Sequence, residues 1–369
     1  MAVSDVEAIE SFELTPVAPL RARSKRRQLA EAAAYLVVGV GAVYAGLVPL
    51  GHVTGVVKVP VVLAGVAALF LACDRAGKAI WGRSFDTGFW LSATWVGLLT
   101  LATLTADLLP LGNSDDLSKT GATVGNLRPD LFSSHPLGTN NFSFDLLARS
   151  IYAARVSLGT ALVAVGVGLV VGGLVGLCAG YFRGKVDAVV GVLTDTVLAL
   201  PALVLLIAIF AVLGPPTTVP DAILKEGLAL AVVSIPTIVR VARANTLTFA
   251  QRDFVLSARA MGAKSSRIIF RELLPNVVLP LISYAFIIMA VLIVVEGTLA
   301  FLGLGLQPPT PTWGNMIAEG AGGGNNPEVL SKYPHIALVP GAFMFLTVFS
   351  LNRIGEYARR RLDPREAKV

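Results

Sequence analysis

The sequence predicts an all-α protein, a polytopic membrane helical bundle, from its composition, its apolar runs and the placement of its basic residues. Of the 369 residues, 54% are hydrophobic and only 15% are charged, and the mean hydropathy is +0.72. This is more apolar surface than a water-soluble core of this size can bury. A bilayer-spanning helix needs about 20 mainly apolar residues. The chain contains eight such runs, at residues 30–50, 56–73, 87–108, 151–180, 188–213, 227–249, 275–304 and 335–354.

Basic residues set the expected orientation, because Lys and Arg near membrane helices stay on the cytoplasmic side. With the N-terminus inside, 23 of the 30 Lys and Arg residues fall in cytoplasmic segments. Both termini are therefore predicted to be cytoplasmic, and topology explains the net charge of +6 without a nucleic acid partner. The basic segments are 21–27, 75–83, 183–185, 240–271 and 353–368.

The predicted runs divide the chain into four parts. Residues 1–29 form a cytoplasmic tail, 30–86 an extra transmembrane hairpin with a cytoplasmic loop, 87–356 the main transmembrane domain, and 357–369 a cytoplasmic C-terminal tail. The hairpin is expected to be uncleaved, because no small-residue cleavage site follows its first run. Its role stays open between packing around the core, binding lipid and contacting a partner. Within the domain, 109–150 and 305–334 are predicted external loops, and 250–274 is a predicted cytoplasmic loop.

Residues 252–276 read RDFVLSARAMGAKSSRIIFRELLPN, a basic amphipathic segment between two apolar runs. Phe254, Val255, Ala258 and Met261 recur at helical spacing and predict one apolar face. Gly262 is expected to end this helix in a left-handed conformation. Ser265 or Ser266 is expected to cap a second helix, and Pro275 to open the membrane helix that follows. The alternative is a segment that lies on lipid headgroups.

Several residues inside the apolar runs predict packing or bending. Gly168, Gly172, Gly176 and Gly180 form three small-xxx-small steps, which let two helices approach closely within this chain or against a second membrane subunit. Pro201 and Pro236 each remove a backbone hydrogen bond and predict kinks, with a moving gate as the alternative.

Two acids also lie in the apolar runs. Glu296 is expected near the outer boundary, either solvated or lining a pore, and Asp195 is expected to pair with Arg240 or Arg243.

The sequence offers no catalytic constellation. Its three histidines, His52, His135 and His335, lie far apart, and neither the HExxH spacing nor the GxSxG elbow is present. The phosphate-binding GxxxxGK[ST] pattern is also missing. We therefore predict no catalytic residue, no metal site and no ATP hydrolysis by this polypeptide.

Motifs from His135 to near the C-terminus carry a family resemblance. His135-Pro136-Leu137-Gly138-Thr139, with Asn141-Phe142 and Asp145, is similar to the "HPLGTDxFGRD" signature of C-type permease subunits of dipeptide, oligopeptide and nickel ABC importers. Ser143 and Phe144 replace its usual Gly and Arg. Leu256-Ser257-Ala258, Gly262 and Leu274-Pro275 resemble the "EAA…G…LP" loop of such permeases, with Leu256 at the Glu position and Glu272 at the Ile position. Further matches are 179–184, 301–305, 307–314 and 362–365.

The resemblance implies a six-helix importer core, formed by the third to eighth runs, that moves peptides by alternating access. It implies a B-type permease partner, two ABC ATPase subunits that bind ATP and Mg²⁺, an extracytoplasmic peptide-binding protein and contact with membrane lipid. The implied ATPase-coupling residues are Phe254, Leu256, Ser257, Ala258, Arg259, Met261, Gly262, Ala263, Arg267, Leu274 and Pro275. The implied binding-protein contacts are His135, Gly138, Thr139, Asp145, Pro309, Trp313 and Gly314.

Three rival functions stay open at this point. An ion-coupled secondary transporter would bind its driving ion in discontinuous helices near the bilayer midplane. A regulatory or scaffold membrane protein would use the same docking loop without transport. Within the resembling family, the cargo would be a nickel chelate or glutathione instead of a peptide, although no metal-ligand cluster favours nickel.

Overall fold

The computed structural model describes most of the chain and shows that it is helical. The described residues are 25–47, 55–82, 85–112, 114–116, 125–130, 133–214, 216–322 and 328–362. They contain helices and one isolated β-bridge, between Thr139 and Asp145. The all-α prediction is therefore confirmed. The predicted tails lie mostly outside the described residues, which begin at Lys25 and end at Leu362.

Six helices of the described chain are long and apolar enough to cross a membrane. They are Lys25–Ala45, Thr87–Leu104, Leu146–Phe182, Val219–Phe249, Ser265–Phe301 and His335–Arg361. A bent pair adds a seventh if it is counted as one span. Eight spans were predicted. The second was expected in α2 (Gly55–Trp81), which is not among the six, so a span there stays a prediction.

The chain forms two compact units, Met1–Trp90 and Leu91–Val369. In the first unit, α1 (Lys25–Leu47) and α2 pack along each other as an antiparallel hairpin. Gly39 and Gly65 bring the two backbones together, because a Cβ at either position would lie 2.8 Å from the other helix's side chain. Arg75 of α2 forms an ion pair with Glu31 of α1.

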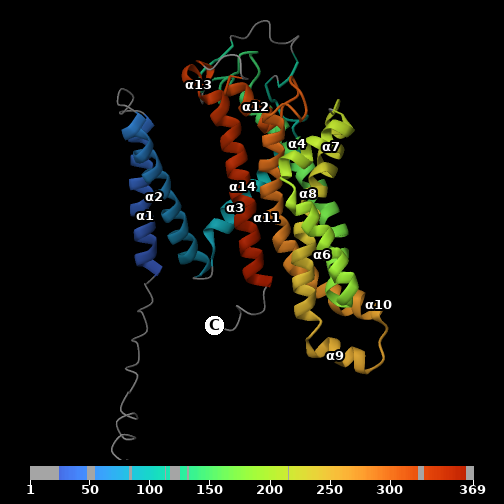
Figure 1. The fold of residues 1–369 in the computed structure, drawn as a ribbon. Coiled ribbons are helices and arrows are strands. Elements are labelled where there is room, and N and C mark those ends of the chain that lie inside the picture. Colours follow the sequence, from blue (N-terminus) through green and yellow to red (C-terminus); the bar gives the residue numbers. More distant parts are fainter. Residues whose placement is uncertain are drawn as a thin grey trace, which may run out of the picture. The chain divides into compact units, whose positions relative to one another are not determined.

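The second unit is a helical bundle (Figure 1). Its central helices are α8 (Val219–Phe249), which packs against α4 and α5, and α11 (Leu274–Phe301), which packs against α14 and α4. Short helices lie at its two ends, which we name the α9 end and the α12 end. The other elements are α3 (Thr87–Leu104), α4 (Leu146–Val167), η3 (Gly168–Gly172), α5 (Gly173–Phe182), α6 (Gly184–Ala199), α7 (Ala202–Leu213), α9 (Asp253–Ala260), α10 (Ser265–Arg267), η4 (Ile268–Leu273), α12 (Trp313–Gly320), α13 (Glu328–Lys332) and α14 (His335–Leu362).

The four glycines at four-residue spacing all face α8. A Cβ on Gly172 would lie 3.0 Å from the Ile235 carbonyl oxygen, and one on Gly176 would lie 2.5 Å from that of Val239. Gly168 and Gly180 meet side chains of the same helix. A four-residue repeat drifts around an ordinary helix of 3.6 residues per turn, and the wider π-helical turn η3 reduces this drift. The close contact predicted for these glycines is therefore made within this chain.

We expect Gly176→Leu to destabilise the bundle strongly, because the backbone of α8 occupies the space that the new side chain needs. Overpacking of this kind costs about 1–3 kcal/mol or more. Gly166→Ala is the matched control, since nothing lies within 4 Å of a Cβ built there, and alanine favours the helix by about 0.5–1 kcal/mol. Thermal unfolding of purified protein measures both. Equal midpoints for the two variants would contradict this packing.

Pro201 has a larger effect than the predicted kink. The run expected as one helix at 188–213 is divided into α6 and α7, which meet at an angle of 89°. Proline fixes its own φ and disfavours the helical region for the residue before it. Leu200 and Pro201 both have extended backbone, with ψ of 134° and 123°. Pro236, by contrast, is buried inside the uninterrupted helix α8.

Candidate functional site

The segment between α8 and α11 forms two short helices, as predicted. α9 ends at Ala260, and Gly262 adopts a left-handed φ of 77° that lets the Ala263 N–H donate to the Ala258 carbonyl at 3.1 Å. The expected serine cap is wrong, because Lys264 occupies the N-cap and Ser265 and Ser266 lie inside α10. The chain then passes through η4 into α11, where Pro275 occupies the first turn.

The predicted four-residue apolar face is divided between two surfaces. Val255 and Ala258 are buried, and α9 packs through them against neighbouring elements that include η4. Leu256 and Met261, in contrast, are 49% and 80% exposed, and Phe254 is exposed as well. Met261 projects outward because the chain reverses at Gly262 immediately after it. The α9 end thus presents apolar side chains that the described part of the chain does not cover.

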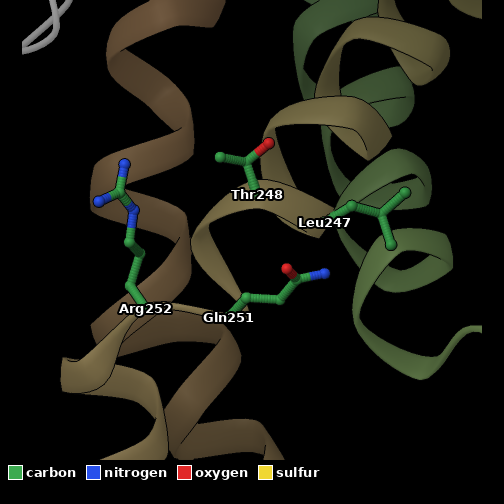
Figure 2. Close-up of a pocket in the computed structure, with 4 residues that line it drawn as sticks. All are labelled: Leu247, Thr248, Gln251 and Arg252. Atoms are coloured by element: carbon green, nitrogen blue, oxygen red, sulfur yellow. The ribbon is translucent and has the colours of Figure 1, made fainter. Parts of the chain in front are cut away.

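Two neighbouring pockets lie beside these exposed residues and share Gln251. One, with a volume of about 390 Å³, is lined by Leu247, Thr248, Gln251 and Arg252, from the last turn of α8 and the connection to α9 (Figure 2). The other, of about 380 Å³, is lined by Tyr181, Arg183, Ala250, Gln251, Leu256 and Arg259.

Three arginines border the pockets. The Arg259 guanidinium lies 5.8 Å from the centre of the Tyr181 ring, a cation–π contact that positions it. Arg183 and Arg252 line the two pockets. The α9 end therefore combines exposed apolar side chains with a positively charged border. Of the remaining predicted coupling residues, Ser257 and Arg267 are exposed on the same segment, and Leu274 is half-buried at the start of α11.

Ion pairs join α6 to α8 near this end. Arg240 donates to Asp195 at 2.6 Å, so one of the two predicted partners of Asp195 is confirmed. Arg243 instead binds Asp187 through both Nε and Nη2, with 2.6 Å between Nη2 and Oδ2. Since α8 leads directly into α9, these pairs connect α6 mechanically to the segment with the exposed apolar side chains.

At the α12 end, the HPLGT motif folds around the start of α4. Asp145 caps this helix by accepting the Ala148 N–H at 2.7 Å, and it binds His135 Nδ1 at 2.8 Å. The helix therefore begins at Leu146, five residues earlier than predicted. Gly138 has a left-handed φ of 84°, and a Cβ there would lie 2.3 Å from the Leu127 carbonyl oxygen. Only glycine fits this position.

Several residues expected to contact a binding protein are instead inside this end of the bundle. Thr139 and Trp313 are fully buried, and Trp313 Nε1 donates to the Ser150 carbonyl at 3.0 Å. Gly314 packs directly against α11, where a Cβ would meet the Gly297 carbonyl oxygen at 2.3 Å. Pro309 is exposed. The buried residues shape this end, and direct contact through Pro309 stays a prediction.

Arg149 is a functional candidate that sequence reasoning missed. It is 1% exposed and binds Glu319 of α12 at 3.2 Å, while its guanidinium also donates to the carbonyl oxygens of Ser114 and Pro309. Asn140 donates to the second Glu319 oxygen at 2.5 Å. Burial raises the pKa of the Glu319 carboxyl, and both partners oppose that rise. The only sequence signal was an arginine at the margin of an apolar run.

Glu296 is neither solvated nor at an open surface. It is 1% exposed, and the Ser157 hydroxyl of α4 donates to its Oε2 at 2.8 Å. Glu226 of α8, which sequence reasoning did not single out, is 2% exposed and lies nearby. The expectation of a solvated carboxyl is wrong, because the long helix α11 is covered by α4 and α8 at this depth.

The comparison with known proteins decides the family. Residues 172–368 match the family described as binding-protein-dependent transport system inner membrane component. The chain belongs to this family. The expected resemblance to ABC importer permeases of the peptide class is therefore confirmed, and the permease is a multi-pass inner-membrane protein. The family and the named relatives are membrane permease components of transport systems.

Named relatives of the permease carry peptide or glutathione transport in their descriptions. A dipeptide transport system permease protein of Alkalihalophilus pseudofirmus is 34% identical over 73% of this chain and 85% of that protein. A di/tripeptide transport system permease protein of Pseudomonas aeruginosa is 38% identical over 62% and 72%. A glutathione transport system permease protein of Pectobacterium atrosepticum is 35% identical over 63% and 73%.

Proposed function

We propose that this permease translocates di- and oligopeptides across the cytoplasmic membrane by alternating access, with energy supplied by separate ATPase subunits. The family implies an ATPase, a binding protein and a permease partner. We assign these as two ABC ATPases that hold ATP and Mg²⁺, an extracytoplasmic peptide-binding protein, and a B-type permease. Both termini and the α9 end then face the cytoplasm, in agreement with the distribution of Lys and Arg.

The single observation that carries this proposal is the exposed apolar surface of the α9 end. Leu256 and Met261 are uncovered, and arginines lie around them at the two pockets. Burying such a surface in a groove of a cytoplasmic ATPase stabilises the contact, at about 25 cal/mol per Å² of apolar area. The ion pairs from α8 to α6 would transmit motion of α9 into the bundle.

A cysteine at Met261 tests where this surface docks. Met261→Cys in vesicles that contain the complete transporter should crosslink to the ATPase subunit, and the crosslink should change when ATP is added. Cysteine at Leu338, which is 65% exposed on α14 near the α12 end, is the control and should give no such product. Capture of lipid alone at Met261 would contradict docking.

Uptake by the reconstituted transporter separates the rival functions and cargoes. Dipeptide uptake should need ATP and should stop with vanadate. Uptake that continues without ATP but collapses with an ionophore would indicate an ion-coupled transporter instead. Glutathione is the second cargo to test, because relatives that are 35% and 36% identical over 63% of this chain carry that description. Preference for glutathione over dipeptides would change the proposed substrate but not the proposed function as an ATP-driven importer.

A further inference from the structure

Two acidic side chains lie close enough inside the bundle, near the α12 end, for their charges to interact. Glu226 lies seven residues after the start of α8, and Glu296 lies five residues before the end of α11. At ~1.5 Å per residue, each is roughly 8–10 Å inside the end of its helix. Both carboxyls are at least 98% buried, with exposures of 2% and 1%, and Ser157 of α4 is fully buried beside them.

Each carboxyl has one oxygen with a partner and one without. Glu296 Oε2 accepts the Ser157 hydroxyl at 2.8 Å, and the backbone amide of Leu306 donates to the Glu226 carboxyl. The other oxygen of each residue, Oε1, is buried and has no hydrogen-bond partner among the described residues. Gly305 closes the site, since a Cβ there would lie 3.3 Å from Glu226 Oε1.

No cationic side chain of the described chain neutralises this pair. The basic residues on the same helices are engaged elsewhere: Arg149 with Glu319 of α12, Arg155 with Asp107, Lys225 with Asp221, Arg240 with Asp195, and Arg243 with Asp187. His335, at the start of α14, bonds to the backbone of Thr139 and Leu127. The other titratable group of α11 is Tyr284, twelve residues away from Glu296. Two ionised carboxylates would thus be buried with no compensating charge.

Such an arrangement is costly, because a buried unpaired carboxylate loses its hydration and two of them repel each other. Binding a proton removes the charge and turns an unpartnered oxygen into a donor. Calcium would need six to eight oxygen ligands, and only two free carboxylate oxygens are present. A proton is the ligand that this small, closed site fits.

We propose that Glu226 and Glu296 form a proton-binding site, in which at least one carboxyl is protonated at neutral pH and joins α4, α8 and α11 beneath the loop after α11. Losing the proton leaves two charges in the bundle and loosens this joint. The site is independent of the docking surface at the α9 end, so neither proposal depends on the other.

Infrared spectroscopy of the assembled transporter tests the protonation. With ¹³C-labelled glutamate, the unsubstituted complex at neutral pH should show the C=O stretch of a protonated glutamic acid. The double variant Glu226→Gln/Glu296→Gln should lose it, while Asp187→Asn, which removes an ion-paired acid, should leave it unchanged. No protonated-glutamate stretch in the unsubstituted complex overturns the proposal, even if the variants do not fold.

Stability against pH gives a second readout. A carboxyl whose proton affinity is higher in the folded state stabilises at low pH, and that contribution is lost as pH rises through its folded-state titration. The unfolding midpoint of the unsubstituted complex should therefore fall above neutral pH. The fall should be less than half as large in the double variant. An equal fall in both, or stabilisation by added Na⁺ or Mg²⁺ at constant ionic strength, overturns proton binding.

Discussion

Arg149→Met should destabilise the permease by about 3–5 kcal/mol, the usual consequence of removing one partner of a buried ion pair. The substitution leaves Glu319 buried without its cation and removes the donor to the carbonyl oxygens of Ser114 and Pro309. The contacts that it breaks join the start of α4 to α12 and to the loop that contains Pro309. We therefore expect a large drop in the thermal midpoint of the purified protein and in its amount in the membrane.

The double variant Arg149→Met/Glu319→Leu is the matched control. Apolar residues of similar volume can replace a buried ion pair at little cost, because no charge is then left unpaired. The double variant should recover most of the stability lost by Arg149→Met alone, as a double-mutant cycle measures. If the two variants unfold at the same temperature, Glu319 is not the partner that makes Arg149 necessary.

Met261→Glu should lower ATP-driven uptake at least tenfold, while the permease remains folded and at its usual level in the membrane. Met261 is 80% exposed, so the substitution disturbs little packing within the described part of the chain. Placing a carboxylate in an apolar docking groove would cost several kcal/mol of desolvation, and about 1.4 kcal/mol already corresponds to a factor of ten in binding. The measurements are peptide uptake and co-purification of the ATPase.

Met261→Leu provides the control for this prediction, because it keeps the apolar surface and changes only its shape. Uptake should stay within about twofold of the unsubstituted permease, a difference of roughly 0.4 kcal/mol. Normal uptake by Met261→Glu would show that the exposed end of α9 does not carry force into the bundle. Lost uptake with normal ATPase co-purification would separate coupling from docking.

The sequence alone determined the helical fold, the family and the two short helices around Gly262. These depend on local patterns: apolar runs of bilayer length, a glycine where the chain turns back, and motif residues at fixed spacing. The glycine repeat also predicted a close helix contact, because the absence of a Cβ is a property of the residue itself. A structural feature can be predicted from the sequence when residues that are close together along the chain determine it.

Tertiary structure decided which side of each pattern faces inward and which charges meet. Sequence spacing placed Val255, Ala258 and Met261 on one face, but η4 covers the first two and leaves Met261 free. Glu319, the acidic partner of Arg149, lies 170 residues away along the chain, and Ser157, the partner of Glu296, lies 139 residues away. Such contacts form only when separate helices pack, and burial then determines whether a charge must be paired or bind a proton. Residues that are close together in the sequence do not show which of these two outcomes a buried charge will have.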